Sequence, residues 1–342
     1  MCHRKLLLKL RFYGIRNNEL NWIEDFLRDR TQKVLVRGSE SPEGSVTSGV
    51  PQGLVLGPLL FLVYINDISA ATTSSEISLF ADDALLYKNV KSIQDKRDLQ
   101  KDLDRLIEWE QAWSMEFNAD KCKVIRITNK RKITEGTYSI HGYNLELVKT
   151  AKYLGVILDN KLTFKQHIST TAAKAQNCQH FLQRNLRNCS KDVKLQSYKT
   201  FIRPIVEYAS TVWDPVGNQC LTYQLESVQR KSARWICNQW SYEASPTAMV
   251  RDLQLQTLQT RRQLNRLSTL YQLNHGIKFM PPGTINKQRC TNLRFQPIQG
   301  AILCYTYSFY PFTINEWNKL PANIVNASSL DIFKVNLLAH LK

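Results

Sequence analysis

The chain has 342 residues and a formal net charge of +17 at pH 7, and 43% of its residues are hydrophobic. This composition is typical of a globular protein and excludes a largely disordered chain. The longest apolar stretch, residues 54–65, is too short to span a bilayer and is interrupted by Gly57 and Pro58. The charged N-terminal segment lacks the small-residue cleavage site of a signal peptide, so we expect an intracellular protein, nuclear or cytoplasmic, without a membrane partner.

The excess positive charge lies in the second half of the chain. Residues 1–160 carry 23 Lys and Arg against 21 Asp and Glu, whereas residues 161–342 carry 23 against 8. A basic half joined to a nearly neutral half is typical of a protein that binds a polyanion, of which nucleic acid is the commonest. A generally basic, solvated surface would have the same charge, so charge alone leaves both interpretations open.

Helical and strand patterns alternate over the first 160 residues. Apolar residues at helical spacing predict helices over residues 4–30 with a break at 14–18, over 55–68 with burial all round, and over 92–113 with one apolar face. Strand patterns occupy residues 32–38, 122–128 and 153–159, and a Gly and Pro loop occupies 48–53. Because this order lacks a repeated strand–helix–strand rhythm, we expect an α+β domain built on one antiparallel sheet.

Beyond residue 160 the strand signals fade and helical patterns dominate. Helices are predicted over residues 191–213 and 225–237, and the Pro-Pro-Gly sequence at 281–283 marks a linker. The chain therefore divides into residues 1–160, a basic helical domain over 161–280, and a C-terminal segment over 281–342 to which the sequence assigns no role.

Two adjacent carboxylates stand out in ISLFADDALLY, residues 77–87, where Asp82 and Asp83 lie between apolar runs. Carboxylates at a buried position need a compensating cation, and no basic residue lies nearer along the chain than Lys88. One interpretation is an ordinary hairpin whose turn uses Asp because its side chain bonds the local backbone. The other is a hairpin tip that presents Asp82 to a divalent metal ion, since carboxylate oxygens suit Mg²⁺.

Seven segments, taken in order, resemble the reverse transcriptases of non-LTR retrotransposons, in particular those of jockey-like elements. They are SGVPQGLVLGPLLFLVYINDI (48–68), FADD (80–83), WSMEFNADKCKV (113–124), YLGVILD (153–159), YKTFIRPIVEYASTVWDP (198–215), LESVQRKSARWI (225–236) and INEWNKLP (314–321). FADD alone is a weak signal, but FADD at this place in the series is specific. The resemblance implies an incomplete right-hand polymerase, with a palm over residues 1–160 and a thumb over 161–280.

The resemblance implies RNA-directed DNA polymerase activity with an RNA template, a DNA primer and deoxynucleotide triphosphates as partners; no protein partner can be inferred. In such enzymes the primer 3′-hydroxyl attacks the α-phosphorus of the nucleotide while two Mg²⁺ ions, with Mn²⁺ as an alternative, stabilise the reacting oxygens. Asp82 and Asp83 match the metal ligands. Because successive strand residues point to opposite faces, we expect Asp82 to be the main ligand and Asp83 to support it.

The resemblance also assigns the substrate-binding residues. The loop residues Gly49, Pro51, Gln52 and Gly53 would lie against nucleotide and template, where glycines let the backbone approach a ligand and Gln52 offers both a donor and an acceptor. The family usually has a small polar residue where this chain has Leu54.

Three further parts of the site follow from the same resemblance. Phe80 and Ala81, beside the carboxylates, would complete the nucleotide contact. Lys121, or alternatively Lys123, would lie near the departing pyrophosphate, where a cation offsets developing charge. A primer grip would contain the residues of the 153–159 segment that match the family, namely Tyr153, Leu154 and Gly155.

One departure from the family affects activity. The strand that carries another essential Asp lies, in the family, just upstream of a segment like residues 2–14, which here begins directly after Met1. The resemblance therefore implies an N-terminally truncated polymerase, without fingers or the first catalytic strand, that is inactive in this form. The alternative is a catalytically silent remnant that only binds nucleic acid. A two-metal nuclease ranks last, because no further carboxylate or His cluster accompanies the pair.

Overall fold

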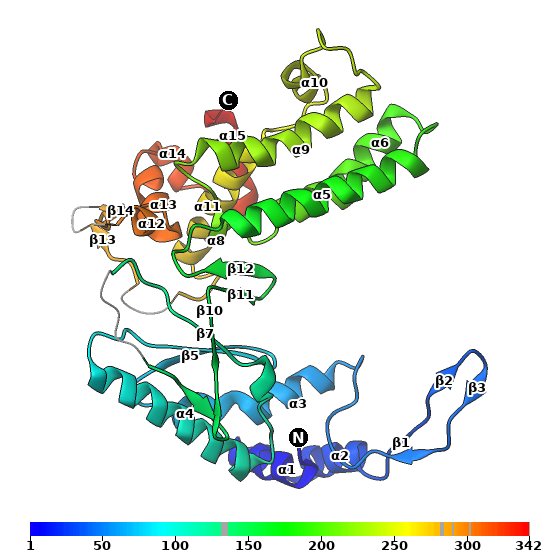
Figure 1. Cartoon of the computed structure of the whole chain (residues 1–342), viewed down its shortest axis with the longest axis vertical. Helices are drawn as coiled ribbons and strands as arrows, with labels where there is room; N and C mark the ends of the chain where they lie inside the picture. Colours follow the sequence, from blue (N-terminus) through cyan, green and yellow to red (C-terminus); the bar gives the residue numbers. More distant parts are fainter. Residues whose placement is uncertain (131–135, 281–283, 289–290, 301, 342) are drawn as a thin grey trace. The chain divides into compact units, whose positions relative to one another are not determined.

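A computed structural model describes residues 1–130, 136–280, 284–288, 291–300 and 302–341. The chain forms two compact units, residues 1–149 and residues 150–342 (Figure 1). This division places the segment 150–159 with the C-terminal unit, whereas the sequence-based prediction ends the first domain at residue 160. None of the described helices is both long and apolar enough to cross a membrane.

The α-helices of unit 1 lie where periodicity predicts them, and two short 3-10 helices, the second of which was not predicted, accompany them. They are α1 (His3–Phe12), α2 (Asn17–Leu27), α3 (Leu56–Ile65), the 3-10 helix η1 (Asn66–Ala71), α4 (Ile93–Trp113) and the 3-10 helix η2 (Ala119–Lys121). Gly14, with a φ of +92°, lies in the predicted break between α1 and α2. A reciprocal capping box between Ser92 and Asp95 fixes the start of α4, and Ser114 in the left-handed conformation ends it.

The strands of unit 1 form separate pairs. The antiparallel pairs are β1 (Thr31–Gln32) with β4 (Gly44–Ser45), β2 (Leu35–Val36) with β3 (Ser39–Glu40), β5 (Glu76–Phe80) with β6 (Asp83–Tyr87), and β8 (Ser139–Ile140) with β9 (Tyr143–Asn144). The pair β7 (Lys123–Ile125) with β10 (Glu146–Val148) is parallel. The prediction of one antiparallel sheet is therefore wrong for the described residues. Apart from β5 and β6, these strands have only two or three residues and make too few hydrogen bonds to build a wider ladder.

Two predicted strands are interrupted by turns. The strand predicted over 32–38 is split into β1 and β2, and it ends in a turn at Arg37 and Gly38, both with positive φ. The strand predicted over 153–159 is instead the second half of a hairpin. Its first residues belong to a turn at Leu154 and Gly155, with φ values of +44° and +82°. Only Gly adopts such angles at little cost, so the glycines mark these reversals.

The core of unit 1 lies between α1, α3 and α4. Its fully or nearly fully buried side chains include Leu6, Leu10, Leu60, Tyr64 and Leu106. The prediction that α3 is buried all round is wrong, because Leu59 and Leu62 are 53% and 48% exposed. An apolar sequence predicts an apolar surface, but it does not determine whether each face of the helix has a partner.

A buried lysine ties α1, α3, η1 and α4 of unit 1 together. Lys9 of α1 is 4% exposed, and its Nζ donates to Asp67 Oδ1 at 2.5 Å and to the Tyr64 carbonyl. The same Nζ lies 3.7 Å from the ring centroid of Trp113 in α4. Burial lowers the pKa of Lys9, while Asp67 opposes that shift.

Unit 2 is mainly helical, as its sequence predicts. It begins with the β11 (Thr150–Tyr153) and β12 (Val156–Asp159) hairpin. The helices are α5 (Lys165–Asn185), α6 (Lys191–Ser197), the π-helix η3 (Tyr198–Ile202), α7 (Arg203–Glu207), α8 (Ser210–Trp213), α9 (Gln219–Cys237), α10 (Pro246–Asp252), α11 (Leu258–Asn274), α12 (Leu303–Thr306), α13 (Phe309–Trp317), α14 (Ala322–Val325) and α15 (Leu330–His340). A second hairpin pairs β13 (Lys287–Gln288) with β14 (Thr291–Phe295). The linker predicted at 281–283 lies outside the described residues.

The helix predicted over 191–213 is broken into four pieces. Pro204 lacks a backbone N–H and cannot follow an unbroken α-helix, so the π-turn η3 precedes it. Ala209, with a φ of +50°, separates α7 from α8. Apolar periodicity continues across these breaks and therefore does not reveal them.

Two hydrophobic clusters hold unit 2 together. One joins α5, η3, α9 and α10 around Ile168, Tyr198 and Leu225, all without exposed surface. The other joins α11, α13 and α15, where the Trp317 and Phe333 rings stack at 5.7 Å. Both clusters are built from residues far apart in sequence.

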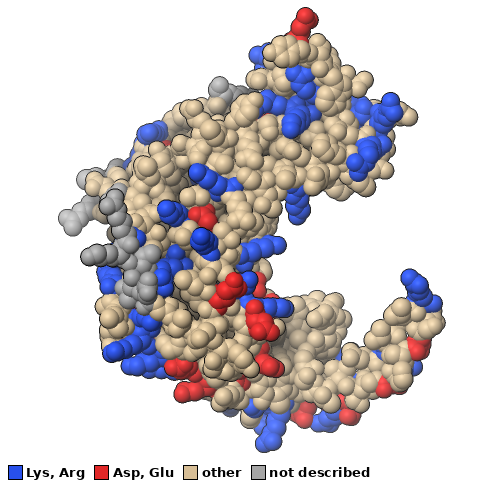
Figure 2. Space-filling view, in the orientation of Figure 1, with Lys and Arg blue, Asp and Glu red and all other residues tan. Residues whose placement is uncertain are grey.

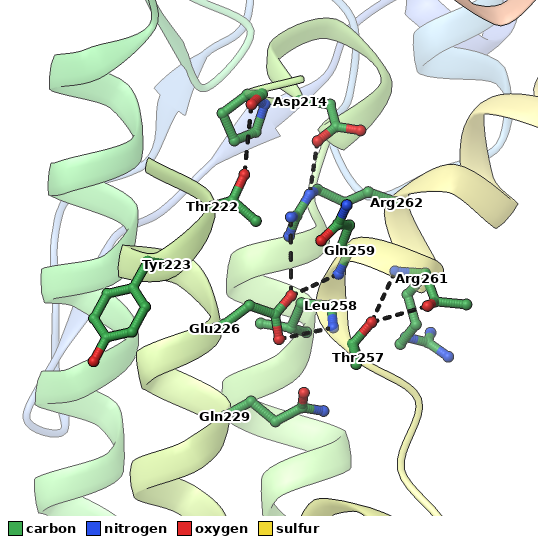
Figure 3. Close-up of polar contacts among 12 residues, drawn as sticks. Asp214, Thr222, Tyr223, Glu226, Gln229, Thr257, Leu258, Gln259, Arg261 and Arg262 are labelled. Carbon is green, nitrogen blue, oxygen red and sulfur yellow. Dashed lines mark hydrogen bonds and ion pairs between the residues drawn. The ribbon is translucent and has the colours of Figure 1, made fainter. Parts of the chain in front are cut away.

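Buried ion pairs link α8, α9 and α11 (Figure 3). Arg262 is 1% exposed, and its Nε donates to Asp214 at 2.8 Å, while Arg266 also pairs with Asp214. The Glu226 carboxylate accepts from the backbone N–H groups of Leu258 and Gln259 at 3.3 and 2.7 Å, at the first turn of α11. Each of these carboxylates is thus committed to holding helices together.

Candidate functional site

The two candidate metal ligands lie at the tip of the β5–β6 hairpin. Phe80 pairs with Asp83, so the reversal consists of Ala81 and Asp82 alone. Ala81 has a φ of +50°, in the region that residues other than Gly seldom adopt. The hairpin predicted from the sequence is confirmed, with Asp82 in the turn and Asp83 as the first residue of β6.

The hairpin has one face on the core and one face away from it. Ile77, Leu79 and Leu86 pack against the core of unit 1. In a hairpin, residues paired across the two strands share a face, and so do every second residues along one strand. Asp83, which pairs with Phe80, therefore lies with Phe80 on the face opposite to Leu79. Phe80 is 63% exposed. The side chains that frame the tip are therefore less buried than the apolar sequence predicts.

Asp82 and Asp83 are themselves exposed. Within the part of the chain that the structure describes, neither carboxylate accepts a hydrogen bond or forms an ion pair. The expectation that Asp82 and Asp83 are buried is therefore wrong. Because water solvates both carboxylates, neither needs the compensating cation that a buried position would require. A carboxylate that formed the turn would accept from a neighbouring backbone N–H, and no such bond is present among the described residues.

A buried aspartate, which the sequence did not single out, fixes the start of the hairpin. Asp102 of α4 has no exposed surface and accepts from the backbone N–H groups of Thr73 and Ser74 at 3.0 and 3.1 Å. It also accepts from the Ser74 hydroxyl at 2.7 Å and pairs with Arg105 at 3.0 Å. Burial alone would raise the pKa of Asp102, but these hydrogen bonds hold it well below its usual value.

The 48–53 loop is tied to the first helix. The Gly49 N–H donates to the Met1 carbonyl at 2.9 Å, and His3 Nε2 lies 2.8 Å from the Gly49 carbonyl oxygen. Gly49 and Gly53 have φ values of +85° and +81°, and a Cβ on either would meet no atom within 4 Å. The structure therefore explains these glycines by backbone conformation, and the open space beside them agrees with an accessible loop.

Gly57 has a packing role that the sequence did not reveal. A Cβ at Gly57 would lie 2.4 Å from the carbonyl oxygen of Pro51, so only Gly lets α3 begin this close to the loop. Pro51 is half-buried, and the adjoining Gln52 is exposed. The contact holds the loop against the first turn of α3 and leaves the Gln52 side chain accessible.

Of the two candidate lysines, Lys121 is the unpaired one. Lys123 Nζ lies 3.5 Å from Glu146 across the β7–β10 pair. Lys121 is exposed at the end of η2, and its side chain has no ion pair or hydrogen bond among the described residues. An unpaired ammonium is available to an anionic ligand, which favours Lys121.

The predicted primer-grip residues form the tip of the β11–β12 hairpin in unit 2. The Tyr208 hydroxyl donates to the Leu154 carbonyl at 3.0 Å. A Cβ at Gly155 would lie 3.1 Å from the Tyr208 ring, so this tyrosine packs closely against the turn. Tyr153, the last residue of β11, precedes the turn.

The candidate residues thus form four local groups. The hairpin tip, the 48–53 loop and Lys121 belong to unit 1, and the grip belongs to unit 2. Within the described part of unit 1, the Asp82 and Asp83 carboxylates and the Lys121 side chain form no hydrogen bond or ion pair with one another or with the 48–53 loop. The same part of the chain contains no group of three or more His, Cys, Asp or Glu side chains that could hold a metal ion. The hard oxygens of Asp82 and Asp83 fit two of the ligands that a Mg²⁺ ion requires.

Comparison with known proteins identifies a family over the first part of the chain. Residues 2–158 match the family described as reverse transcriptase (RNA-dependent DNA polymerase). The matched region contains the 48–53 loop, the β5–β6 hairpin, Lys121 and the turn of the β11–β12 hairpin.

Similar proteins come from mobile elements of Drosophila melanogaster. The chain is 31% identical over 247 residues to a probable RNA-directed DNA polymerase from transposon X-element, covering 69% of the chain and 26% of that protein. It is 31% identical to the RNA-directed DNA polymerase from mobile element jockey, covering 63% of the chain and 24% of that protein. It is 28% identical to a probable RNA-directed DNA polymerase from transposon BS, covering 80% of the chain and 31% of that protein. The chain spans about a quarter of the length of the first two relatives. By family, this chain belongs to the RNA-directed DNA polymerases of non-LTR retrotransposons.

Proposed function

We propose that the β5–β6 hairpin is the metal-binding tip of a reverse transcriptase active site, within a palm formed by residues 1–160. The observation that carries this proposal is the state of Asp82 and Asp83, which are exposed and, among the described residues, have no partner. Neither carboxylate makes a contact that supports the fold in the described part of the chain, so the oxygens of both remain available to a divalent metal ion, which takes carboxylate ligands. Asp102 holds the base of the hairpin, so the carboxylates are presented from a supported element.

Each remaining group has a role in the proposed reaction. Asp82 and Asp83 hold the metal, which when bound supplies positive charge to the attacking and leaving oxygens. Gln52 contacts the nucleotide and template through its amide, and Lys121 offsets the negative charge of the departing pyrophosphate. The Leu154–Gly155 turn, fixed by Tyr208, supports the primer end. The bond that forms joins the primer 3′-oxygen to the α-phosphorus, and the bond that breaks releases pyrophosphate.

The helical part of unit 2 would serve as the thumb, over residues 161–280. The visible faces of α5, α6 and α9 carry Lys and Arg side chains and few acidic ones (Figure 2). Such a surface contacts phosphates without regard to sequence. The proposed partners are therefore an RNA template and a DNA primer, with deoxynucleotide triphosphates and Mg²⁺.

Primer extension on an RNA template tests the catalytic proposal. The relatives are about four times as long as the region that matches them. The assay therefore compares this chain with a longer protein that contains it and has about the length of those relatives. In the longer protein, Asp82→Asn is expected to reduce extension by more than about a hundredfold, because it removes a charged metal ligand.

The matched control is Asp104→Asn, which changes an exposed aspartate of α4 in the same unit. Extension by the control should equal that of the parent. Full extension by Asp82→Asn would refute the assignment of the hairpin. Nucleic-acid binding without extension in the longer protein would support the narrower function of a silent remnant.

A further inference from the structure

A small polar cavity that is open to solvent lies within unit 2, and none of its lining residues belongs to the four candidate groups of the preceding site. Its volume is about 280 Å³, and residues of the α7–α8 turn, α11, the segment after α11 and α15 line it. Pockets for whole drug-sized ligands usually exceed about 300 Å³, so this cavity suits a small group or one part of a larger ligand.

The walls of the cavity are held by contacts on α11. Asp214, at the end of α8, pairs with Arg262 and Arg266 of α11, which fixes α8 against that helix. On the other side, the Tyr271 hydroxyl donates to the Ala327 carbonyl at 2.7 Å, just before α15. The cavity is therefore built between elements that are bound to one helix rather than between loops.

The buried part of the lining consists of hydroxyl groups. Ser268 is 7% exposed, and its Oγ has no hydrogen-bond partner among the described residues. Ser210 is 2% exposed, and its Oγ accepts from Asn265 Nδ2 at 3.4 Å, which leaves the Ser210 proton free to donate. A buried hydroxyl without a partner, such as that of Ser268, is costly, and an anionic oxygen in the cavity would accept a hydrogen bond from it.

The charge of the lining is positive. Lys278 and Lys334 line the cavity, and neither forms an ion pair or a side-chain hydrogen bond within the described residues. Glu207 also lines it, but both of its carboxylate oxygens are engaged by Arg261, with Nη2 at 3.0 Å from Oε2. The one acidic group is thus neutralised, and two ammonium groups remain available.

We propose that this cavity binds a phosphate group. Two lysines and several hydroxyls on different walls offer donors from several directions, which suits a tetrahedral oxyanion better than a planar carboxylate. The phosphate can come from the backbone of a nucleic acid or from a small phosphate-bearing molecule. Most of the lining lies in the part of unit 2 proposed as the thumb, but none of it belongs to the proposed metal site or primer grip, so the inference does not rest on the assignment of Asp82 and Asp83.

Phosphorus-31 NMR titration of the full chain with inorganic phosphate tests the proposal. The parent should bind one phosphate saturably, and the double variant Lys278→Gln, Lys334→Gln should raise the Kd by at least about tenfold. The matched control Lys91→Gln, Lys149→Gln removes two exposed lysines of unit 1, outside both the cavity and the proposed thumb, and should change the Kd less than about twofold.

Ser268→Ala provides an independent test without a change of charge. It should weaken phosphate binding about threefold or more, because one donor is lost, while the circular dichroism spectrum stays that of the parent. Absence of saturable binding by the parent, or equal weakening by the two lysine pairs, would overturn the proposal.

A competition arm identifies the source of the phosphate. A short single-stranded oligonucleotide that displaces the bound phosphate from the parent would identify a nucleic-acid backbone as the ligand. An oligonucleotide that binds without displacing it would identify a free phosphate or a small phosphate ester. Asp82→Asn should bind phosphate with the parent Kd, so failure of the active-site proposal would leave this result unchanged.

Discussion

The acidic residues of the β5–β6 tip and those of unit 2 are in opposite situations. In unit 2, Asp214, Glu207 and Glu316 each pair with an arginine of α11. At the hairpin tip, Asp82 and Asp83 are exposed and have no partner in the described part of the chain. Both regions contain charges next to apolar sequence, but only in unit 2 does the fold use them. The contrast separates carboxylates that stabilise the structure from carboxylates that are free to bind a ligand.

The largest effect should follow from removing a carboxylate in unit 2. Asp214→Ala leaves Arg262 and Arg266 without their shared partner in a buried site, and we expect it to lower the free energy of unfolding by about 3–5 kcal/mol. Scanning calorimetry of the full chain would measure the loss. Asp252→Ala, at an exposed position of α10, should change stability by no more than about 0.5 kcal/mol. Similar losses for the two variants would refute the structural role of Asp214.

A smaller loss should follow at the base of the hairpin in unit 1. Asp102→Asn keeps the shape of the side chain but removes a charge that accepts several hydrogen bonds, and we expect it to cost about 3 kcal/mol at pH 7. Urea unfolding of parent and variant would measure this difference. Asp104→Asn, on the exposed side of α4, should be nearly neutral.

The same variant predicts a pH dependence. The folded-state pKa of Asp102 lies below its unfolded value of about 3.9. Its stabilising contribution is therefore fully present above pH 4 and is lost as the pH falls through the folded-state pKa. The stability difference between parent and Asp102→Asn should shrink as the pH falls from 4 towards 2. A difference that stayed constant over this range would contradict the assigned hydrogen bonds.

The surface charge of unit 2 predicts salt-dependent binding. The affinity of the full chain for single- or double-stranded DNA should fall with a slope of about 0.7–0.9 per phosphate contact in a plot of log affinity against log salt. Two contacts correspond to about a tenfold loss between 50 and 200 mM salt. Fluorescence anisotropy at several salt concentrations would measure the slope. Binding that did not respond to salt would exclude a phosphate-binding surface.

The grip hairpin should show the smallest change in stability. Tyr208→Phe removes the hydroxyl that donates to the Leu154 carbonyl but keeps the ring beside Gly155. We expect a loss of about 0.5–1 kcal/mol, since the tyrosine is 58% exposed and water can replace the bond. Hydrogen exchange at the β11–β12 amides would detect the loosened turn. Unchanged exchange rates would show that ring packing alone holds the hairpin.

Local patterns predicted much of the fold. Helical spacing and the break at Gly14 locate α1 and α2, and the apolar face over residues 92–113 locates α4, because these signals lie within a few residues of one another. The hairpin at Asp82 is likewise local. The turn at Leu154 and Gly155 was missed because the apolar residues continue through it.

Long-range pairings could not be predicted from the sequence. Lys9 and Asp67 lie 58 positions apart, and Asp102 meets Ser74 across 28 positions. Nor could the sequence show that Leu59 and Leu62 lie on an exposed face of α3, because burial depends on which neighbours reach that face. The exposure of Asp82 was mispredicted for the same reason.

The free energy of unfolding of Asp82→Asn most directly tests the claim that this carboxylate serves a ligand rather than the fold. It should lie within about 0.5 kcal/mol of the parent value in urea unfolding at pH 7, because the side chain is exposed and makes no hydrogen bond among the described residues. A loss of about 1 kcal/mol or more would mean that Asp82 bonds the turn backbone in solution. The hairpin would then be an ordinary turn, and the contrast with unit 2 would be wrong.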